Sequence, residues 1–282
     1  MNSSNSEDKS FVTVIDSSAK FGWWKYLQEV WFYRDLFYFL VWRDLKTRYA
    51  QSVLGIGWAI IQPLFSMLVF TIVFGNMARI SSDGVPYAIF SFAALVPWTY
   101  FSGALTGAGG SLITARGIIT KVYFPRIIVP LVAVAGKLWD FGIGLIMLFG
   151  MMIYFGFGPT SQMLLLPMVT ILMVLAASGI GMWVTALAIQ YRDIRYSLGF
   201  GIQLLMYASP VVYPASMVPE RFRLLYNLNP MTSVIESFRS ILLSTNPIPW
   251  DGLAIGLFVS VLLSVSGAVY FIGMERKFAD VV

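Results

Sequence analysis

The chain has 282 residues, of which 58% are hydrophobic and only 12% are charged, and it carries a formal net charge of +5. Soluble domains are about 45–50% apolar and about 25% charged, so this composition excludes an ordinary water-soluble domain. Cysteine and histidine are absent, which excludes disulfides, thiol nucleophiles, histidine triads and zinc or iron–sulfur sites built on those residues. The sequence also lacks a Gly-x-x-x-x-Gly-Lys-[Ser/Thr] loop. We therefore expect a membrane protein with no catalytic residues, cofactor or metal of its own.

The first segment, residues 1–29, is predicted to be a polar cytosolic tail. Its first ten residues are polar and rich in serine. They lack the basic start, apolar core and small-residue cleavage site of a signal peptide.

Residues 30–49 are rich in aromatic side chains but too charged to cross a bilayer. Aromatic rings suit the headgroup level, so this segment predicts an amphipathic helix lying in the cytosolic interface. Its cations are candidates for contacts with an anionic lipid or a phosphate group. The alternative is that they only anchor the protein on its basic side, because several of them do not share one helical face. The candidate headgroup residues are Arg34, Arg43, Lys46 and Arg48.

Charge-free windows predict six transmembrane helices, because about 20 apolar residues are needed to cross the hydrocarbon core. Glycine and proline at residues 156–159 split the longest window into two spans. The third span has to accept Lys137 and Asp140, which at i and i+3 share one face and predict an intramembrane ion pair. A substrate contact is the alternative for this pair. The spans lie near residues 54–76, 87–112, 127–155, 163–190, 196–213 and 252–274.

Lysine and arginine are concentrated in the loops on one side of these spans. Basic loops lie on the cytosolic side of membrane proteins, so both termini are expected in the cytosol.

The segment before the last span is too short and too interrupted by proline to cross the membrane. Asn229-Pro230 is a good helix start, and apolar residues follow at helical spacing. Residues 219–244 therefore predict two short re-entrant helices that act as a gate, with Pro230, Met231 and Phe238 as gate residues. A loop packed on the outer membrane surface is the alternative.

Aromatic residues close to a glycine-rich stretch are candidates for lining a path through the protein. Flat aromatic faces suit the apolar C–H patches of sugar rings, and small residues let helices approach one another closely. The alternative is an ordinary interfacial belt. The candidate channel aromatics are Trp98, Tyr100, Phe101, Tyr207 and Tyr213.

Several strings, in this order, resemble the membrane subunit of ABC exporters of polysaccharides and polyol phosphates, which move O-antigen, capsule or teichoic acid. The resemblance runs from about Leu36 to the C-terminus. The strings are FLVWRDLKTRYAQSVLGIGWAIIQPL (39–64), FAALVPWTYFSGAL (92–105), ITKVYFPRIIVPL (119–131), ALAIQYRDIRY (186–196), ASPVVYP (208–214) and LNPMTSVIESFR (228–239).

This resemblance implies an all-α integral membrane protein with an N-terminal interface helix followed by a transmembrane domain. That domain, residues 50–282, would contain six spans and two re-entrant gate helices before the last span. It implies a bacterial inner-membrane homodimer that works with two copies of an ABC ATP-binding subunit, which holds ATP and Mg²⁺. The substrate would be a glycan on a polyprenyl pyrophosphate lipid, with no nucleic acid involved. The cytosolic loop 113–126 would be the main coupling helix, seated on the ATPase, with Arg116 and Lys121 as coupling residues.

Three other functions are alternatives to this assignment, and the sequence argues against the last two. An ABC permease for a drug or small lipid shares the architecture. An ion-coupled secondary transporter would show inverted repeats and more intramembrane charges than the pair at residues 137 and 140. A membrane glycosyl- or phosphotransferase would need several loop carboxylates, whereas the 14 acidic residues are scattered.

Overall fold

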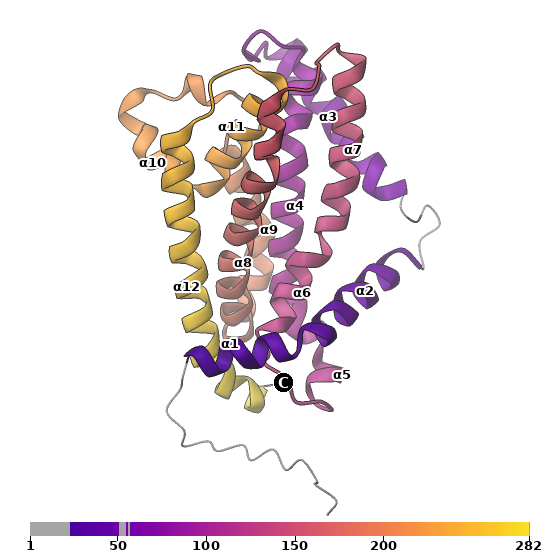
Figure 1. Ribbon diagram of the computed structural model, residues 1–282, viewed down its shortest axis with the longest axis vertical. Coiled ribbons are helices and arrows are strands. Elements are labelled where there is room, and N and C mark those ends of the chain that lie inside the picture. The colour runs from indigo at the N-terminus through magenta and orange to yellow at the C-terminus, as the bar shows by residue number, and fades with distance from the viewer. Residues whose placement is uncertain (1–22, 51–54, 56, 282) are drawn as a thin grey trace, which may run out of the picture.

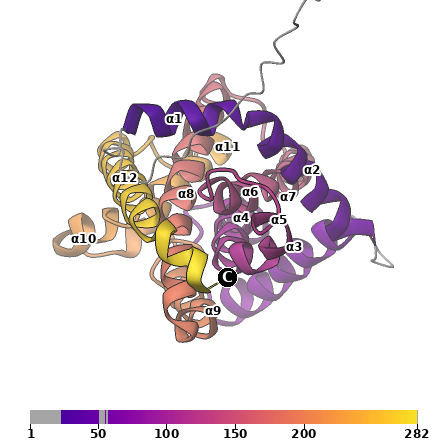
Figure 2. The same ribbon diagram turned by 90° about the horizontal axis from the view of Figure 1, so that it is seen from below.

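A computed structural model describes residues 23–50, 55 and 57–281, and the regular elements within them are helical (Figure 1). The long helices run side by side along the long axis of the molecule, while α1 and α2 cross one end of the bundle. We call this the α1–α2 end, and the opposite one the α11 end. Seen along the bundle, α1 and α2 form an arc around one side of it (Figure 2).

The helices follow one another without long intervening loops. The first half comprises α1 (Trp23–Phe32), α2 (Arg34–Ala50), α3 (Gly57–Phe70), its π-helical continuation η1 (Thr71–Met77), α4 (Tyr87–Thr114), α5 (Arg116–Ile119), α6 (Ile128–Gly136) and α7 (Leu138–Tyr154). The second half comprises η2 (Ser161–Leu165), α8 (Leu166–Gln190), α9 (Arg192–Tyr207), η3 (Ala215–Met217), η4 (Glu220–Phe222), α10 (Arg223–Asn227), α11 (Pro230–Leu243) and α12 (Trp250–Val281).

The core is built around α4, which is apolar on all sides and buried over most of its length. A helix that is hydrophobic all round belongs in the interior of a bundle. It contacts α3, α6, α7, α8 and α11, and α8 in turn packs along α12. The α8–α12 contact needs a small residue, because a Cβ on Gly179 would lie 2.6 Å from the backbone nitrogen of Ser264.

Five helical stretches in the described residues are long and apolar enough to cross a membrane. They correspond to the first, second, third, fourth and sixth predicted spans. The predicted fifth span, 196–213, differs: α9 has 16 residues, begins with charged residues at Arg192 and ends at Tyr207. Residues 208–213 leave the helix because Pro210 lacks a backbone N–H and disfavours the helical conformation of the residue before it. Six complete spans therefore remain a prediction.

The third predicted span is interrupted at Lys137, which separates α6 from α7. The Lys137 backbone N–H donates to the Val134 carbonyl, a tighter turn than that of a regular α-helix. The preceding Gly136 also weakens the helix locally. The break places the charged side chains of the third span beside α2.

The predicted interface helix, 30–49, is two helices that meet at Tyr33, and α1 begins within the predicted tail, at Trp23. The remainder of that tail, to residue 22, lies outside the described residues, as do the first residues of the predicted first span. At the α1–α2 end the Tyr26 hydroxyl donates to Glu275 Oε2 at 3.2 Å, and the backbone N–H of Arg126 donates to Glu275 Oε1 at 2.9 Å. One carboxylate thus joins α1, α12 and the segment before α6.

The α11 end contains the segments predicted as gate helices. The helix α10 is short and exposes Leu224 and Leu225, whereas α11 is buried on nearly all sides. The N-terminus of α11 is capped as the sequence predicts, since Asn229 Oδ1 accepts from the backbone N–H of Met231 at 3.1 Å.

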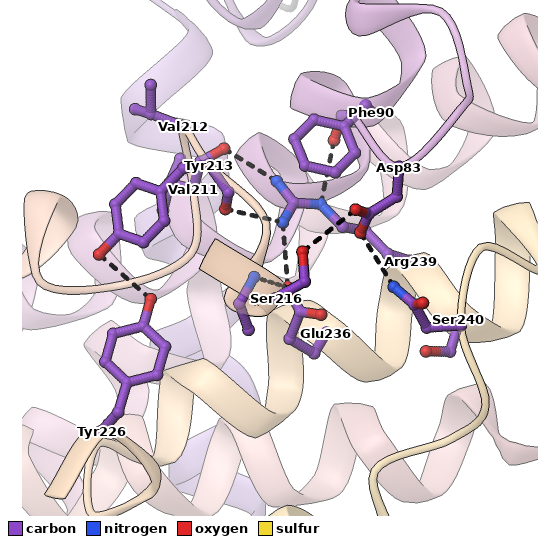
Figure 3. A network of polar contacts seen from close by, with 12 residues as sticks. Asp83, Phe90, Val211, Val212, Tyr213, Ser216, Tyr226, Glu236, Arg239 and Ser240 are labelled. Carbon is purple, nitrogen blue, oxygen red and sulfur yellow. Dashed lines mark hydrogen bonds and ion pairs between the residues drawn. The ribbon is translucent and has the colours of Figure 1, made fainter. Parts of the chain in front are cut away.

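A buried arginine ties α11 to its surroundings (Figure 3). The Arg239 guanidinium donates to the backbone carbonyls of Phe90, Val211 and Tyr213 at 3.0–3.3 Å and to Glu236 Oε1 at 3.1 Å. It also lies 3.6 Å from the centre of the Phe90 ring. Arginine suits this role because its five N–H donors satisfy several acceptors at once.

A second acidic group joins the neighbouring loops at this end. Asp83 accepts from the Ser216 hydroxyl at 3.2 Å and from the Asn246 amide at 2.9 Å. The loops before α4, after α9 and before α12 are therefore held together by side-chain hydrogen bonds.

Replacing Arg239 by alanine is expected to lower the free energy of unfolding by about 3–5 kcal/mol, the usual cost of leaving a buried ionic partner unpaired. Glu236 and three carbonyls would lose their shared donor. Denaturation of the purified protein in detergent measures the change. The matched control is Arg223→Ala: Arg223 is largely exposed and lies 3.9 Å from Glu220, so its loss should cost less than about 1 kcal/mol. Equal losses for the two variants would contradict the prediction.

Candidate functional site

Four charged side chains meet where α2 reaches the break between α6 and α7. Arg48 Nη1 lies 3.1 Å from Asp140 Oδ2, and Lys137 Nζ lies 3.1 Å from the same oxygen. The second Arg48 nitrogen, Nη2, lies 2.7 Å from Asp44 Oδ2, four residues earlier on α2. The predicted pair of Lys137 and Asp140 is thus part of a larger cluster that also includes two residues of the interface helix. We call these four residues the charged cluster.

The sequence permits this approach because the residue facing α2 has no side chain. A Cβ on Gly136 would lie 3.1 Å from Asp44 Oδ2 and 3.6 Å from Arg48 Nη2. On the other side of the cluster, a Cβ on Gly103 would lie 3.2 Å from Lys137 Cε. Two small residues, one on α6 and one on α4, therefore make room for long charged side chains inside the bundle.

Tyr49 adds a fifth polar group, since its hydroxyl donates to Asp140 Oδ1. Partial burial raises the pKa of Tyr49 to about 12, and the hydrogen bond to Asp140 and the charge of that carboxylate act in the same direction. The hydroxyl therefore stays protonated at neutral pH and remains a donor. Asp140 accepts from three donors, contributed by α2 and by the break before α7.

The charged cluster borders a cavity of about 620 Å³, which falls within the usual range for ligand pockets. Arg48, Lys137 and Asp140 form one wall, and Trp58 and Gln62 of α3 form another. The third wall comes from α4, with Thr99, Tyr100, Ser102, Gly103, Thr106 and Gly107 among its residues.

Tyr100 has an unusual position in this wall. Only 1% of the residue is exposed, and its hydroxyl has no hydrogen-bond partner among the described residues. A buried hydroxyl without a partner costs free energy. The wall therefore contains a polar atom that is unpaired within the described residues and closed off from solvent in this conformation.

A smaller cavity of about 200 Å³ lies next to the first and shares Arg48 and Gly107 with it. Arg43 lines this second cavity and makes no ion pair in the part of the chain that the structure describes. Arg43 and Arg48 thus follow one another along α2 toward Lys137.

The other two predicted headgroup cations lie apart from this site. Arg34 is exposed, 3.8 Å from Asp35, with its guanidinium 6.0 Å from the Trp31 ring centre. Lys46 is exposed and lines a separate cavity with Trp42 of α2 and Trp139 of α7. The structure therefore brings Arg43 and Arg48 to the two cavities beside the charged cluster, and not Arg34 or Lys46.

The five predicted channel aromatics occupy different environments. Trp98 and Phe101 are buried among core residues and do not line the cavity, whereas Tyr100 does. Tyr207 on α9 is half exposed. The Tyr213 hydroxyl donates to the Tyr207 carbonyl and accepts from the Tyr226 hydroxyl.

The predicted coupling and gate residues lie at opposite ends of the bundle. Arg116 and Lys121 are exposed at the α1–α2 end, where α4 continues to Thr114 and α5 is a single turn rather than a helix over 113–126. The gate candidates Pro230, Met231 and Phe238 are all buried.

Several side chains of the site were absent from the sequence-based candidates, among them Asp44, Tyr49, Trp58 and Gln62. Asp44 lies four residues before Arg48, a spacing at which opposite charges pair on a helix, so this contact was readable from the sequence. The position of Trp58 in the cavity wall could not be predicted, because the sequence does not show which face of α3 meets α4. Among the described residues, no group of three or more His, Cys, Asp or Glu side chains is placed to hold a metal ion.

Comparison with known proteins identifies the family. The profile of the ABC-2 type transporter family matches residues 35–243. The chain is 28% identical over 250 residues to the O-antigen export system permease protein RfbA of Klebsiella pneumoniae, covering 88% of this chain and 95% of that protein. It is also 28% identical over 256 residues to the O-antigen export system permease protein RfbA of Myxococcus xanthus, covering 90% and 98%.

A more distant relative is the polysialic acid transport protein KpsM of Escherichia coli, 20% identical over 200 residues, with 70% of this chain and 77% of that protein covered. The family match spans most of the chain, including α2, every wall of the cavity and both predicted gate helices. The chain therefore belongs to the ABC-2 type transporter family, as its sequence motifs predicted.

Proposed function

We propose that the chain is the membrane subunit of an ATP-driven exporter that moves a polyprenyl-pyrophosphate-linked polysaccharide out of the bacterial cytosol. The observation that carries this proposal is the similarity to two O-antigen export permeases over nearly the full length of each protein. Transport rather than catalysis is the role of such subunits, and a hydroxylated glycan needs a protein path because hydrocarbon satisfies none of its polar groups.

The chemistry of the cavity supports a phosphate-bearing sugar as the substrate. Arg48 and Lys137 provide cations for a phosphate, and arginine in particular matches phosphate geometry. Trp58 offers an aromatic face, while Gln62 offers hydrogen bonds for sugar hydroxyls. In this proposal Arg43 and Arg48 meet the pyrophosphate as it enters from the cytosolic leaflet.

The α1–α2 end would face the cytosol and the α11 end the outer side, with both termini inside. Two copies of an ATP-binding subunit would bind at the α1–α2 end, because this chain has no nucleotide-binding motif and exposes Arg116 and Lys121 there. The segment containing α10 and α11 would form the outer gate.

A second copy of the chain would complete the path. Few residues of α3 and none of α9 are buried in the single chain. The exposed face of α9 includes Tyr196, Phe200, Gln203 and Tyr207. A face with a glutamine and two tyrosines is a poor partner for lipid tails and suits a protein contact or a polar path.

In proteoliposomes that contain the chain and its ATP-binding subunit, movement of a lipid-linked glycan should require ATP, and the chain alone should hydrolyse none. A variant ATPase that binds but does not hydrolyse ATP is the control. Equal movement with ADP would contradict the proposal. Equal movement of a carrier lipid without its glycan would instead favour a small-lipid permease.

Charge reversal at the coupling residues, Arg116→Glu together with Lys121→Glu, is expected to lower both ATPase stimulation and transport. The variant should unfold at the same temperature as the original protein, because both side chains are exposed. The matched control is Arg221→Glu, which reverses an exposed charge at the α11 end. Unchanged coupling in the double variant would show that the ATPase binds elsewhere.

Replacing Tyr100 by phenylalanine removes the unpaired hydroxyl and keeps the ring. The free energy of unfolding should stay the same or rise by about 1 kcal/mol, since a buried polar atom without a partner disappears. Denaturation of the purified protein in detergent measures the change. Tyr154→Phe, at an exposed tyrosine of α7, is the control and should leave stability unchanged. A loss of stability in Tyr100→Phe alone would show that the hydroxyl has a partner in the folded protein.

A further inference from the structure

Asp140 occupies the position of an anionic ligand within the charged cluster. Its carboxylate accepts from the guanidinium of Arg48, the ammonium of Lys137 and the hydroxyl of Tyr49. These three donors come from two separate parts of the chain, the end of α2 and the break before α7. They converge on one small group of oxygens, as donors do around a bound phosphate.

The cluster has no net charge as it stands. Arg48 and Lys137 contribute two positive charges, and Asp44 and Asp140 contribute two negative ones. An intact cluster therefore attracts an anion only weakly. Removal of the Asp140 carboxylate from its donors would turn the same residues into a cationic site.

Space and further donors are present beside the cluster. The cavity of about 620 Å³ reaches Arg48, Lys137 and Asp140. Among the described residues, one of the three N–H donors of Lys137 is used, by Asp140. Arg43, which makes no ion pair with a described residue, adds a cation in the adjoining cavity. A phosphate entering along α2 would find these donors next to those that Asp140 holds.

We propose that Asp140 is an internal competitor for the phosphate group of the transported lipid: substrate binding transfers Arg48 and Lys137 from the Asp140 carboxylate to phosphate oxygens. This inference rests on the proposed function and assigns a role to a residue of the same site. The ligand class is a diphosphate anion, the group that joins the carrier lipid to the glycan in the proposed substrate. Competition keeps the affinity moderate, which a transporter needs because its substrate has to leave the site again.

If Asp140 competes with the diphosphate, removal of its carboxylate should strengthen diphosphate binding. If Asp140 has only a structural role, the same change should weaken binding. The full chain is placed in lipid nanodiscs, and binding of farnesyl diphosphate is measured by calorimetry at low salt, with farnesol as the uncharged comparison. Asp140→Asn should bind farnesyl diphosphate about tenfold more tightly than the original chain, within the usual range of coupling between two charged sites. Lys137→Gln should bind it about tenfold more weakly.

A double variant provides the same test in case the Asp140→Asn protein unfolds because Lys137 has lost its partner. Lys137→Gln combined with Asp140→Asn removes one charge of each sign, and it should bind farnesyl diphosphate more tightly than Lys137→Gln alone. Asp251→Asn, at an exposed carboxylate near the α11 end, is the matched control and should leave affinity unchanged. Farnesol affinity should be the same in all variants.

The proposal is overturned if removal of the Asp140 carboxylate lowers or does not change diphosphate affinity in both backgrounds. It is also overturned if farnesol affinity rises in parallel, because the gain would then come from the lipid tail. The assay contains neither ATPase nor glycan, so its failure leaves the export measurement untouched. Conversely, a chain that exports no glycan in proteoliposomes refutes the proposed function whatever the order of these affinities.

Discussion

Charges and free backbone groups inside an apolar bundle have to find partners within the protein, because the hydrocarbon around it supplies none. This constraint acts at two places in the chain. Near the α1–α2 end, Arg48 and Lys137 compensate Asp140. Near the α11 end, Arg239 compensates Glu236 and satisfies three backbone carbonyls. These two groups of contacts hold α2, the break between α6 and α7, and the irregular segment after α9 in place.

The sequence was sufficient for features that depend on neighbours along the chain. The apolar windows mark five long spans, the Asn229 cap begins α11, and the spacing of Lys137 and Asp140 gives their pairing. Contacts between distant segments were not readable: Arg48 and Asp140 are 92 residues apart. The aromatic cluster of α4 illustrates the same limit, since all three rings are buried in the core and only Tyr100 also borders the cavity. Which way each ring points depends on the helices around α4.

The cavity wall formed by α3 differs physically from the other two. None of its residues is buried, and it contacts α4 and α7. Lipid tails are as apolar as these side chains, so the hydrophobic effect does not press α3 onto the bundle in a membrane. Pro63 also removes one of its internal hydrogen bonds. Trp58 and Gln62 are therefore carried by a helix that the bundle holds on one side only, and the width of the cavity depends on how α3 lies against α4.

The contacts of Arg239 have a consequence for how the chain is made. Its acceptors at Val211 and Tyr213 precede it by 28 and 26 residues, and Phe90 precedes it by 149. During synthesis the turn after α9 emerges before the side chain that satisfies its carbonyls. That turn therefore cannot reach its final conformation in an apolar environment until α11 has followed it. We therefore expect residues 208–239 to fold together. A chain truncated before residue 239 would lack the side chain that satisfies the turn after α9.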